Sequence, residues 1–329
     1  MSKNRKILVV GGAGYVGTEL TKKLLNLNYE VSVLDLFIYG EKVLREHNNL
    51  TIIKGDLRDK DLLKKIIPGH SDLIHLACIS NDPSFELNPD LGKSINFDSF
   101  RPLVDMSKDN GIKRFVFASS SSVYGIKSDK DVVEDAALEP LTDYSIFKAK
   151  CEEILLKRNS EDFVTTIIRP ATVCGYSDRL RLDLVVNILS NLAFHKREIT
   201  VLGGDQLRPN ININDMCNAY IDILNQEEKK VSGKIYNVGY ENFPVIEIAK
   251  MVKNVIGDDV NIVKKESNDN RSYHISSKKI YNELGFYPKF TIEDAIKDLK
   301  NCFEKKILRD PLNNEFYFNI KRMNSIKLN

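Results

Sequence analysis

Short apolar runs alternate with amphipathic stretches through the first half of the chain. The apolar runs are continuous, which is typical of parallel strands buried on both faces of a sheet. The stretches between them repeat apolar residues at helical spacing and predict crossover helices. The pattern therefore predicts an α/β fold with a doubly wound, Rossmann-type parallel sheet. The expected strands are 6–10, 30–36, 50–54, 73–77, 114–118 and 164–169, and the expected helices are 15–27, 59–67, 95–109 and 143–158.

The second half is less regular and predicts a smaller C-terminal α/β lobe, interleaved with the first domain. Asn214 is the expected N-cap of a helix over 214–224. Residues 305–329 are rich in Asn and Lys and are expected to form a peripheral arm. The expected first domain is 1–173 plus about 211–240, and the expected lobe is 174–210 plus about 241–304. The other expected elements are strands at 199–202 and 234–238 and helices at 183–194, 245–256, 277–284 and 291–303.

The composition excludes several functional classes. The chain has 329 residues, 42% hydrophobic and 29% charged, and its 48 basic and 46 acidic residues leave a formal charge of +2. This balance argues against a nucleic-acid-binding surface, which is strongly basic. No apolar run reaches the roughly 18 residues of a membrane span, and the run at 7–10 is shorter than the roughly 7–15 residues of a signal-peptide core. We therefore expect a cytoplasmic protein that acts on small molecules.

The cysteines and histidines do not show the spacing of a metal site. The five cysteines form no C-x-x-C pair, and the five histidines form no H-x-x-x-H pair. We therefore expect reduced thiols and neither a disulfide framework nor a metal centre.

The first glycine-rich segment follows an expected strand and opens an expected helix. In Gly11-Gly12-Ala13-Gly14-Tyr15-Val16-Gly17, the glycines allow a tight turn and close approach of a pyrophosphate to the backbone. The N–H groups at the start of the helix would bind that anion. Because plain strand–helix turns also use glycine, this segment needs support from the next strand.

Two carboxylates follow the next two strands. Asp35 lies 18 residues after Gly17, where a carboxylate binds the adenosine ribose; it favours NAD over NADP because it would repel a 2′-phosphate. The alternative is a surface aspartate at the end of a strand. Asp56 follows the third strand and is expected to accept a hydrogen bond from the adenine amino group. Its alternative role is helix capping, for which Asp59 is the better candidate.

The candidate catalytic pair is Tyr144 and Lys148, which share one face of an expected helix. A phenol with a pKa of about 10 is a poor base at neutral pH, but a neighbouring ammonium and a positive nicotinamide ring would lower that pKa. Taken alone, this spacing is more often a solvated helix face. It gains weight because a serine run, 119–122, ends a strand where parallel sheets present functional groups.

The chain resembles the extended short-chain dehydrogenase/reductases, the family of nucleotide-sugar epimerases and dehydratases. The resemblance spans residues 5–303 and is carried by the strings GGAGYVG, VLDLF, GDLRD, IHLACIS, SINFDS, SSSSVYG, YSIFK, IIRPATVCG, LRPNININD and YNVG. It implies an NAD-dependent enzyme that acts on a nucleotide-diphosphate sugar. It also implies a homodimer or a larger homo-oligomer.

The resemblance assigns roles to individual residues. Tyr144 would be the general base, Lys148 its partner, and Ser120, four residues before Tyr124, the catalytic hydroxyl. The implied NAD-binding residues are Gly11, Gly14, Tyr15, Val16, Gly17, Asp35, Asp56, Leu57, Leu76, Ala77, Ile79, Asn96, Ser119, Tyr144 and Lys148. The implied substrate-binding residues are Ser80, Asn81, Ser121, Thr172, Arg179, Arg181, Asn187, Arg208 and Arg271.

Several positions depart from the family pattern. Ser121 and Ser122 stand where sugar 4,6-dehydratases carry an Asp-Glu pair, so dehydration is not expected. Ser121 also stands where reductive epimerases carry a cysteine, which argues against 3,5-epimerisation. The usual Asn and Tyr of R-x-x-N-V-Y-G are Thr172 and Cys174, so phosphate contacts in that loop are in doubt.

Two segments resemble a narrower group within this family. Residues 79–83 and 171–187 resemble a subgroup that oxidises C4 of GDP-linked manno-heptoses in capsule synthesis. In the second segment, Arg179 and Arg181 would meet the diphosphate or the sugar; the alternative is a surface position at the start of a helix.

We therefore expect NAD-dependent oxidation at C4 of a nucleotide-linked sugar, with a GDP-manno-heptose favoured. The runner-up is a 4-epimerase of the UDP-glucose type, because the two activities use the same core residues. A non-catalytic NAD-binding sensor is less favoured, because Ser120, Tyr144 and Lys148 are all present.

Overall fold

The computed structural model describes residues 5–127, 129, 131–266, 274–326 and 328. Its main element is a seven-stranded sheet in the order β10-β6-β5-β4-β1-β2-β3, in which every neighbouring pair is parallel. The strands are β1 (Lys6–Val10), β2 (Glu30–Asp35), β3 (Leu50–Lys54), β4 (Asp72–His75), β5 (Arg114–Ala118), β6 (Val164–Pro170) and β10 (Lys234–Val238). The expected doubly wound fold is confirmed, and the strand order reverses between β1 and β4, where such sheets bind ligands.

Helices cover both faces of this sheet. Alternate residues of β1 enter different cores: Ile7 and Val9 pack on the side of α1 and α8, whereas Leu8 and Val10 pack on the side of α2, α5 and α6. This two-sided burial explains why the strand is a continuous apolar run. The helices are α1 (Tyr15–Asn26), α2 (Lys60–Ile66), α3 (Asp82–Glu86), α4 (Pro89–Lys93), α5 (Phe100–Asp109), α6 (Asp143–Leu156), α8 (Ile213–Asn225) and α9 (Glu228–Val231).

Several helix starts differ from expectation, and two of them lie at asparagines whose side chains bond the backbone. The helix expected over 95–109 begins only at α5, because a π-helical turn at Ser94–Asp98 precedes it and turns Asn96 toward Ile79. The cap of α8 is Asn212 and not Asn214, since the Asn212 side chain accepts from the N–H of Asn214. Both differences arise from side-chain bonds to the backbone.

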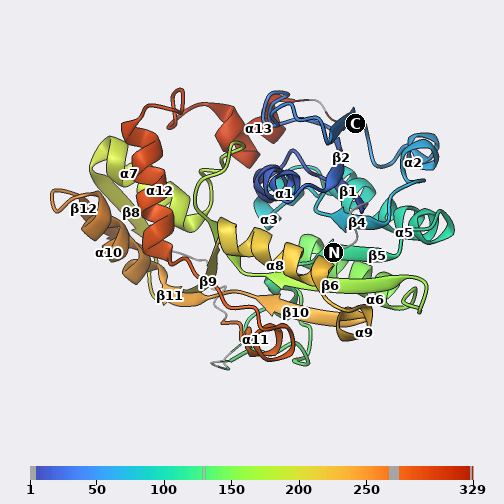
Figure 1. The fold of residues 1–329 in the computed structure, drawn as a ribbon. Coiled ribbons are helices and arrows are strands. Elements are labelled where there is room, and N and C mark those ends of the chain that lie inside the picture. The colour runs from blue at the N-terminus through green and yellow to red at the C-terminus, as the bar shows by residue number, and fades with distance from the viewer. Residues whose placement is uncertain (1–4, 128, 130, 267–273, 327, 329) are drawn as a thin grey trace.

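The smaller lobe has a core of its own. It is built from α7 (Val185–Lys196), β8 (Glu198–Leu202), α10 (Val245–Ile256), β12 (Asn261–Lys265) and α12 (Ile292–Glu304). These elements lie together on one side of the molecule (Figure 1). A three-stranded sheet of β11 (Glu241–Pro244), β9 (Leu207–Asn212) and β7 (Thr172–Cys174) also forms, and α11 (Lys278–Leu284) packs against β10.

The C-terminal residues do not form a peripheral arm. A 3₁₀ turn at Glu315–Tyr317 leads into α13 (Asn319–Ser325), which packs against α3. Figure 1 shows α13 between the lobe and the large sheet. Asn319 is only 1% exposed, so this segment folds back onto its own chain. Among the described helices, none is long and apolar enough to span a membrane.

Candidate active site

A cavity of about 520 Å³ lies at the carboxyl ends of β1, β2, β4 and β5. Its position at the reversal of strand order is the ligand position of doubly wound sheets, and its volume is typical of small-molecule sites. The glycine-rich loop, the loop after β7, β9 and the C-terminal segment all contribute to its wall. The cavity therefore brings together residues from most of the chain.

The glycine-rich loop fits a pyrophosphate. A Cβ on Gly11, which has φ of 89°, would lie 2.4 Å from the backbone nitrogen of Ala77. A Cβ on Gly17 would lie 2.3 Å from the carbonyl oxygen of Gly11, so neither position accepts a side chain. The first turn of α1 has neither a side-chain cap nor an acidic residue. Its N–H groups therefore have no carboxylate of their own helix to bind, which suits an anionic ligand.

Asp35 ends β2 at the wall of this cavity. Its carboxylate accepts from the backbone N–H of Ala13 at 2.9 Å and from that of Phe37 at 2.8 Å, which fixes it beside the glycine-rich loop. Burial raises the pKa of the Asp35 carboxyl, and these two N–H groups oppose the shift. The fixed carboxylate and the glycine-rich loop together fit the ribose and pyrophosphate of a dinucleotide.

Asp56, unlike Asp35, is not among the residues that line the cavity. Its carboxylate accepts from the Arg58 guanidinium, with Nη2 at 2.6 Å, and the neighbours Gly55 and Leu57 line the cavity in its place. Asp59 caps α2, accepting from the N–H groups of Asp61 and Leu62, so the capping alternative for Asp56 is wrong. The adenine contact of Asp56 stays a prediction.

The opposite end of the cofactor position is apolar. Leu76, Ala77 and Ile79 follow β4 and line the cavity. Asn96 contributes to this end through Ile79. Its Oδ1 accepts a hydrogen bond from the Ile79 N–H at 2.8 Å, and its Nδ2 donates to the Ile79 carbonyl oxygen at 3.0 Å. Tyr15 and Val16 also line the cavity.

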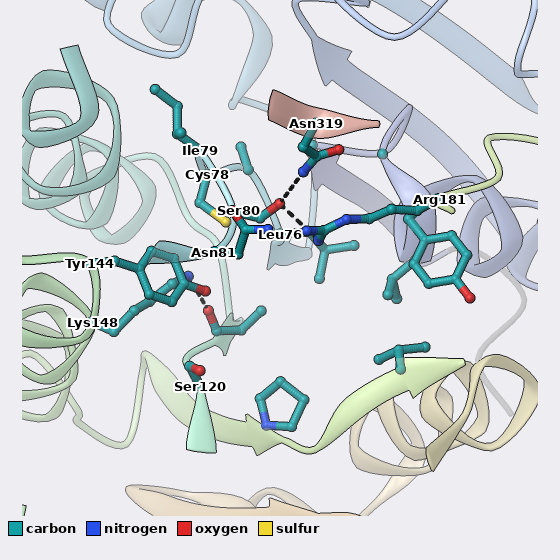
Figure 2. A pocket seen from close by; sticks show the side chains of 18 of the residues that line it. Leu76, Cys78, Ile79, Ser80, Asn81, Ser120, Tyr144, Lys148, Arg181 and Asn319 are labelled. Atoms are coloured by element: carbon teal, nitrogen blue, oxygen red, sulfur yellow. Dashed lines mark hydrogen bonds between the residues drawn. The ribbon is translucent and has the colours of Figure 1, made fainter. Parts of the chain in front are cut away.

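Ser120, Tyr144 and Lys148 lie together on one side of the cavity, and Arg181 and Asn319 lie on the other (Figure 2). Lys148 Nζ donates to the Ala118 carbonyl at 2.6 Å and lies 5.8 Å from the centre of the Tyr144 ring. The Ser120 hydroxyl lies 2.8 Å from that of Ser122. Thr142 and Ser145 cap α6 reciprocally, which fixes the helix turn that carries Tyr144.

The pKa of Tyr144 is raised in this structure. Burial raises it well above the ordinary value, the charges of Cys78 and Asp82 add to the shift, and Arg181 and Ser120 oppose it. Lys148 donates to the Ala118 carbonyl and lies beside the Tyr144 ring, so the lowering of the Tyr144 pKa that we expect from this ammonium and a bound nicotinamide stays a prediction. Arg181, which belongs to a distant loop, is among the groups that favour the phenolate.

Two implied site residues use their polar groups elsewhere. The Ser119 hydroxyl donates to Glu152, so Ser119 lines the cavity without offering that proton to a ligand. Asn187 is fully buried and does not line the cavity; its amide accepts from Gly175 and donates to Tyr15 and the Arg181 carbonyl. Asn187 therefore fixes the loop after β7 and is wrongly placed among the substrate ligands.

The remaining implied substrate residues fall into two groups, those that line the cavity and one that the structure does not describe. Those that line the cavity are Ser80, Asn81, Ser121, Thr172, Arg179, Arg181 and Arg208. Arg179 and Arg181 are 3% and 7% exposed, so the surface alternative for them is wrong. Arg271 lies outside the described residues. Asn319, which sequence reasoning missed, also lines the cavity, and no motif around it marks a functional residue.

A model of the NAD dependent epimerase/dehydratase family matches residues 7–239. The chain belongs to this family. It is therefore an NAD-dependent enzyme of the extended short-chain dehydrogenase/reductase type. The chain is similar to a UDP-glucose 4-epimerase of Lactobacillus helveticus, with 27% identity over 316 residues that cover 88% of this chain and 94% of that protein.

Solved structures share the fold. A UDP-glucose 4-epimerase from Thermotoga maritima with UDP-glucose matches with a TM-score of 0.84 and 24% identity, over 92% of this chain and 100% of that one. A UDP-glucuronic acid 4-epimerase from Bacillus cereus, in complex with UDP-glucuronic acid and NAD, matches with a TM-score of 0.81 and 23% identity, over 92% and 99% of the two chains.

Proposed function

We propose that this enzyme is a 4-epimerase of a nucleoside-diphosphate sugar. One observation carries the C4 chemistry of this proposal: Ser120, Tyr144 and Lys148 converge on the cavity wall beside the cofactor position. The similar proteins named above are 4-epimerases of UDP-sugars. They support a 4-epimerase better than the oxidation of a GDP-manno-heptose that the sequence favoured.

The residues beside Ser120 favour epimerisation over dehydration. Ser121 and Ser122, in the 3₁₀ turn Ser121–Tyr124, carry neutral hydroxyls. Elimination of water next to a 4-keto group needs an acid to protonate the leaving hydroxyl, and a serine is a weak acid for that task. We therefore assign the site to proton and hydride transfer at C4 alone.

The reaction follows from the positions of three side chains. Tyr144, as phenolate, accepts the proton of the C4 hydroxyl, and Ser120 donates a hydrogen bond to the C4 oxygen as the carbonyl forms. Lys148 stays beside the Tyr144 ring through its bond to the Ala118 carbonyl. NAD, when bound, supplies the hydride acceptor. For epimerisation, the 4-keto sugar would present its other face, C4 would take back the hydride on that face, and Tyr144 would return the proton to the C4 oxygen.

Product analysis tests this proposal. Purified protein is incubated with UDP-glucose, UDP-glucuronic acid and a GDP-manno-heptose, and the sugar is followed by NMR while NADH is followed by absorbance. A C4 epimer without net NADH is expected. A keto product with accumulating NADH from the GDP-heptose would overturn the epimerase and establish the 4-dehydrogenase.

Tyr144→Phe tests the central residue. General acid–base catalysis contributes about 10²–10⁴-fold, so turnover should fall by that factor while NAD binding persists. Tyr240→Phe is the matched control, because Tyr240 is 42% exposed. Unchanged turnover in Tyr144→Phe would remove the phenol from the mechanism.

A further inference from the structure

Two arginines on the loop after β7 are buried in the cavity wall with incomplete partners. Arg179 Nε and Arg181 Nη2 are buried and have no hydrogen-bond partner in the described part of the chain. Asp183 accepts from Arg181 at 2.6 Å, but Arg179 bonds a neutral amide and packs on the Tyr39 ring at 3.7 Å. Burial lowers the pKa of the Arg179 guanidinium to about 10. A buried cation with unused N–H groups is costly unless a ligand supplies the missing acceptor.

This loop is tied to the start of α1. The Ser177 hydroxyl donates to the Tyr15 carbonyl at 2.9 Å, and the Tyr15 hydroxyl donates to the Gly175 carbonyl at 2.6 Å. Tyr15 is the first residue of α1, whose opening turn lacks a carboxylate. The arginines and the N–H groups of that turn therefore belong to the same cavity, and both attract an anion.

The two arginines extend along the expected path of the cofactor. Arg179 packs on Tyr39, four residues after the candidate ribose ligand Asp35. Arg181 Nη1 donates to the Ser80 hydroxyl at 3.2 Å, next to Ile79 of the apolar end. Burial raises the pKa of Asp35, and Arg179 is among the groups that oppose the shift. The pair thus lies between the ribose and nicotinamide ends, where a dinucleotide carries its pyrophosphate.

The C-terminal segment holds both arginines in place. Asn319 Oδ1 accepts from Arg179 at 2.6 Å, its Nδ2 donates to Ser80 at 2.9 Å, and its backbone N–H donates to Asp183 at 2.8 Å. Figure 2 shows Ser80 bonded to both Asn319 and Arg181. Asn319 therefore binds Arg179 directly and also contacts Ser80 and Asp183, the two partners of Arg181.

The same segment also contacts the adenosine side. Arg322 Nε donates to the Ile38 carbonyl at 2.5 Å, just after β2, and Met323 belongs to the core cluster that contains Leu34 and Leu57. Leu328 lines the cavity. We call residues 317–326 and 328 the C-terminal strap.

We propose that Arg179 and Arg181 bind the pyrophosphate of NAD, opposite the start of α1, and that the C-terminal strap, through Asn319, holds them there so that the cofactor stays bound during turnover. The inference deepens the proposed function, because an epimerase must keep NADH until the hydride returns. It assigns the two arginines to the cofactor, whereas the resemblance implies that they bind the sugar nucleotide. Arg208, on β9, remains the candidate ligand for the substrate diphosphate.

Competition binding tests the ligand of the arginines. The full-length holoenzyme is loaded with NADH, and displacement by ADP-ribose and by adenosine is followed by NADH fluorescence. A hydrogen bond to a charged group contributes about 1.5–3 kcal/mol, so Arg179→Met and Arg181→Met should each weaken ADP-ribose about 10–100-fold and leave adenosine within about threefold. Arg101→Met, an exposed arginine of α5, is the matched control. Unchanged ADP-ribose affinity with weakened UDP-sugar binding would give the pair to the substrate and overturn the proposal.

Asn319 tests the strap. Asn319→Leu should speed NADH release from the holoenzyme by about tenfold. Asn319→Asp should add a carboxylate to the arginines, raising the resistance of the protein to urea while still weakening ADP-ribose. If Asn319 has only a structural role, the resistance of the variant to urea and its affinity for ADP-ribose should change in the same direction. That result would overturn the proposed role of the C-terminal strap. Because these measurements do not use epimerase turnover, their failure and that of the proposed function are distinguishable.

Discussion

Arg169 and the pair Arg179 and Arg181 are all buried arginines, but their surroundings differ. Arg169 is 2% exposed and binds Glu152 through Nε at 3.0 Å and Nη2 at 2.6 Å. Its Nη1 donates to the Tyr124 hydroxyl at 2.7 Å and the Glu134 carbonyl at 2.9 Å. Burial alone would lower the pKa of Arg169, but Glu152 raises it above the ordinary value.

The difference separates structural charges from functional ones. Arg169 faces a carboxylate inside the protein, so its charge is balanced without a ligand. Of the pair, Arg181 bonds the Asp183 carboxylate and Arg179 bonds the Asn319 amide, and each leaves a buried N–H group unused. Incomplete polar networks are expected where function sets the arrangement. The stability of the first site should therefore depend on its arginine, whereas that of the second should depend on the ligand.

The largest effect is expected from Arg169→Met. The substitution leaves the Glu152 carboxylate buried with only the Ser119 hydroxyl. Removing one partner of a buried ion pair costs about 3–5 kcal/mol, so the free energy of unfolding should fall by that amount in urea titrations. Arg179→Met should change it by less than about 1 kcal/mol, because an underpaired charge is removed. Equal losses in the two variants would break the comparison.

His75 shows a third way to accommodate a buried titratable group, which is to stay neutral. It packs on β4 against Phe100 and Phe117, and its Nδ1 has no hydrogen-bond partner among the described residues. Burial, and then the charge of Lys148, lowers the pKa of His75 to about 3. The unfolded chain, with an ordinary histidine pKa of about 6.5, binds more protons between these two values. The contribution of the neutral His75 to the free energy of unfolding is therefore fully present above about pH 6.5 and decreases as the pH drops.

The expected slope is about 1.4 kcal/mol per pH unit below pH 6.5. Urea unfolding at about pH 7 and about pH 5 should differ by about 2 kcal/mol from this group, and His75→Phe should remove that part. His47→Gln, at an exposed histidine, is the control. A wild-type slope that persists in His75→Phe would place the titration elsewhere.

The large sheet could be predicted because its signals are local. Strands β1, β3, β5 and β10 begin and end at the expected residues. In β1 and β5 the central residues are buried on both faces of the sheet, so these strands are continuous apolar runs. The glycine-rich loop and Asp35 were found because their spacing from β1 and β2 is fixed by the fold. Tyr144 and Lys148 needed only one helix turn to be placed together.

The rest depends on contacts between distant residues. Asn319 meets Arg179 across 140 residues and Ser80 across 239, and nothing near Asn319 in the sequence reports either contact. The strands β7, β9 and β11 were missed because they pair with one another across the chain, and a pairing between distant segments leaves no local pattern. The ammonium of Lys148 donates to the Ala118 carbonyl, and an acceptor on the backbone leaves no signal in the sequence.

The smallest effect is expected from Asp56, whose pair with Arg58 is partly exposed. Burial disfavours its charge, but the Arg58 bonds hold the pKa of Asp56 below the ordinary value. Such pairs contribute about 0–1 kcal/mol, so Asp56→Asn should lower stability by less than about 1 kcal/mol. If its carboxylate accepts the adenine amino group, the variant should weaken NAD about fivefold and leave nicotinamide mononucleotide unchanged, because that molecule has no adenine. Asp59→Asn, which alters the cap of α2 nearby, should leave both affinities unchanged. If Asp56→Asn weakens the binding of both ligands equally, Asp56 does not bind adenine. Its pair with Arg58 would then only maintain the conformation of the loop after β3.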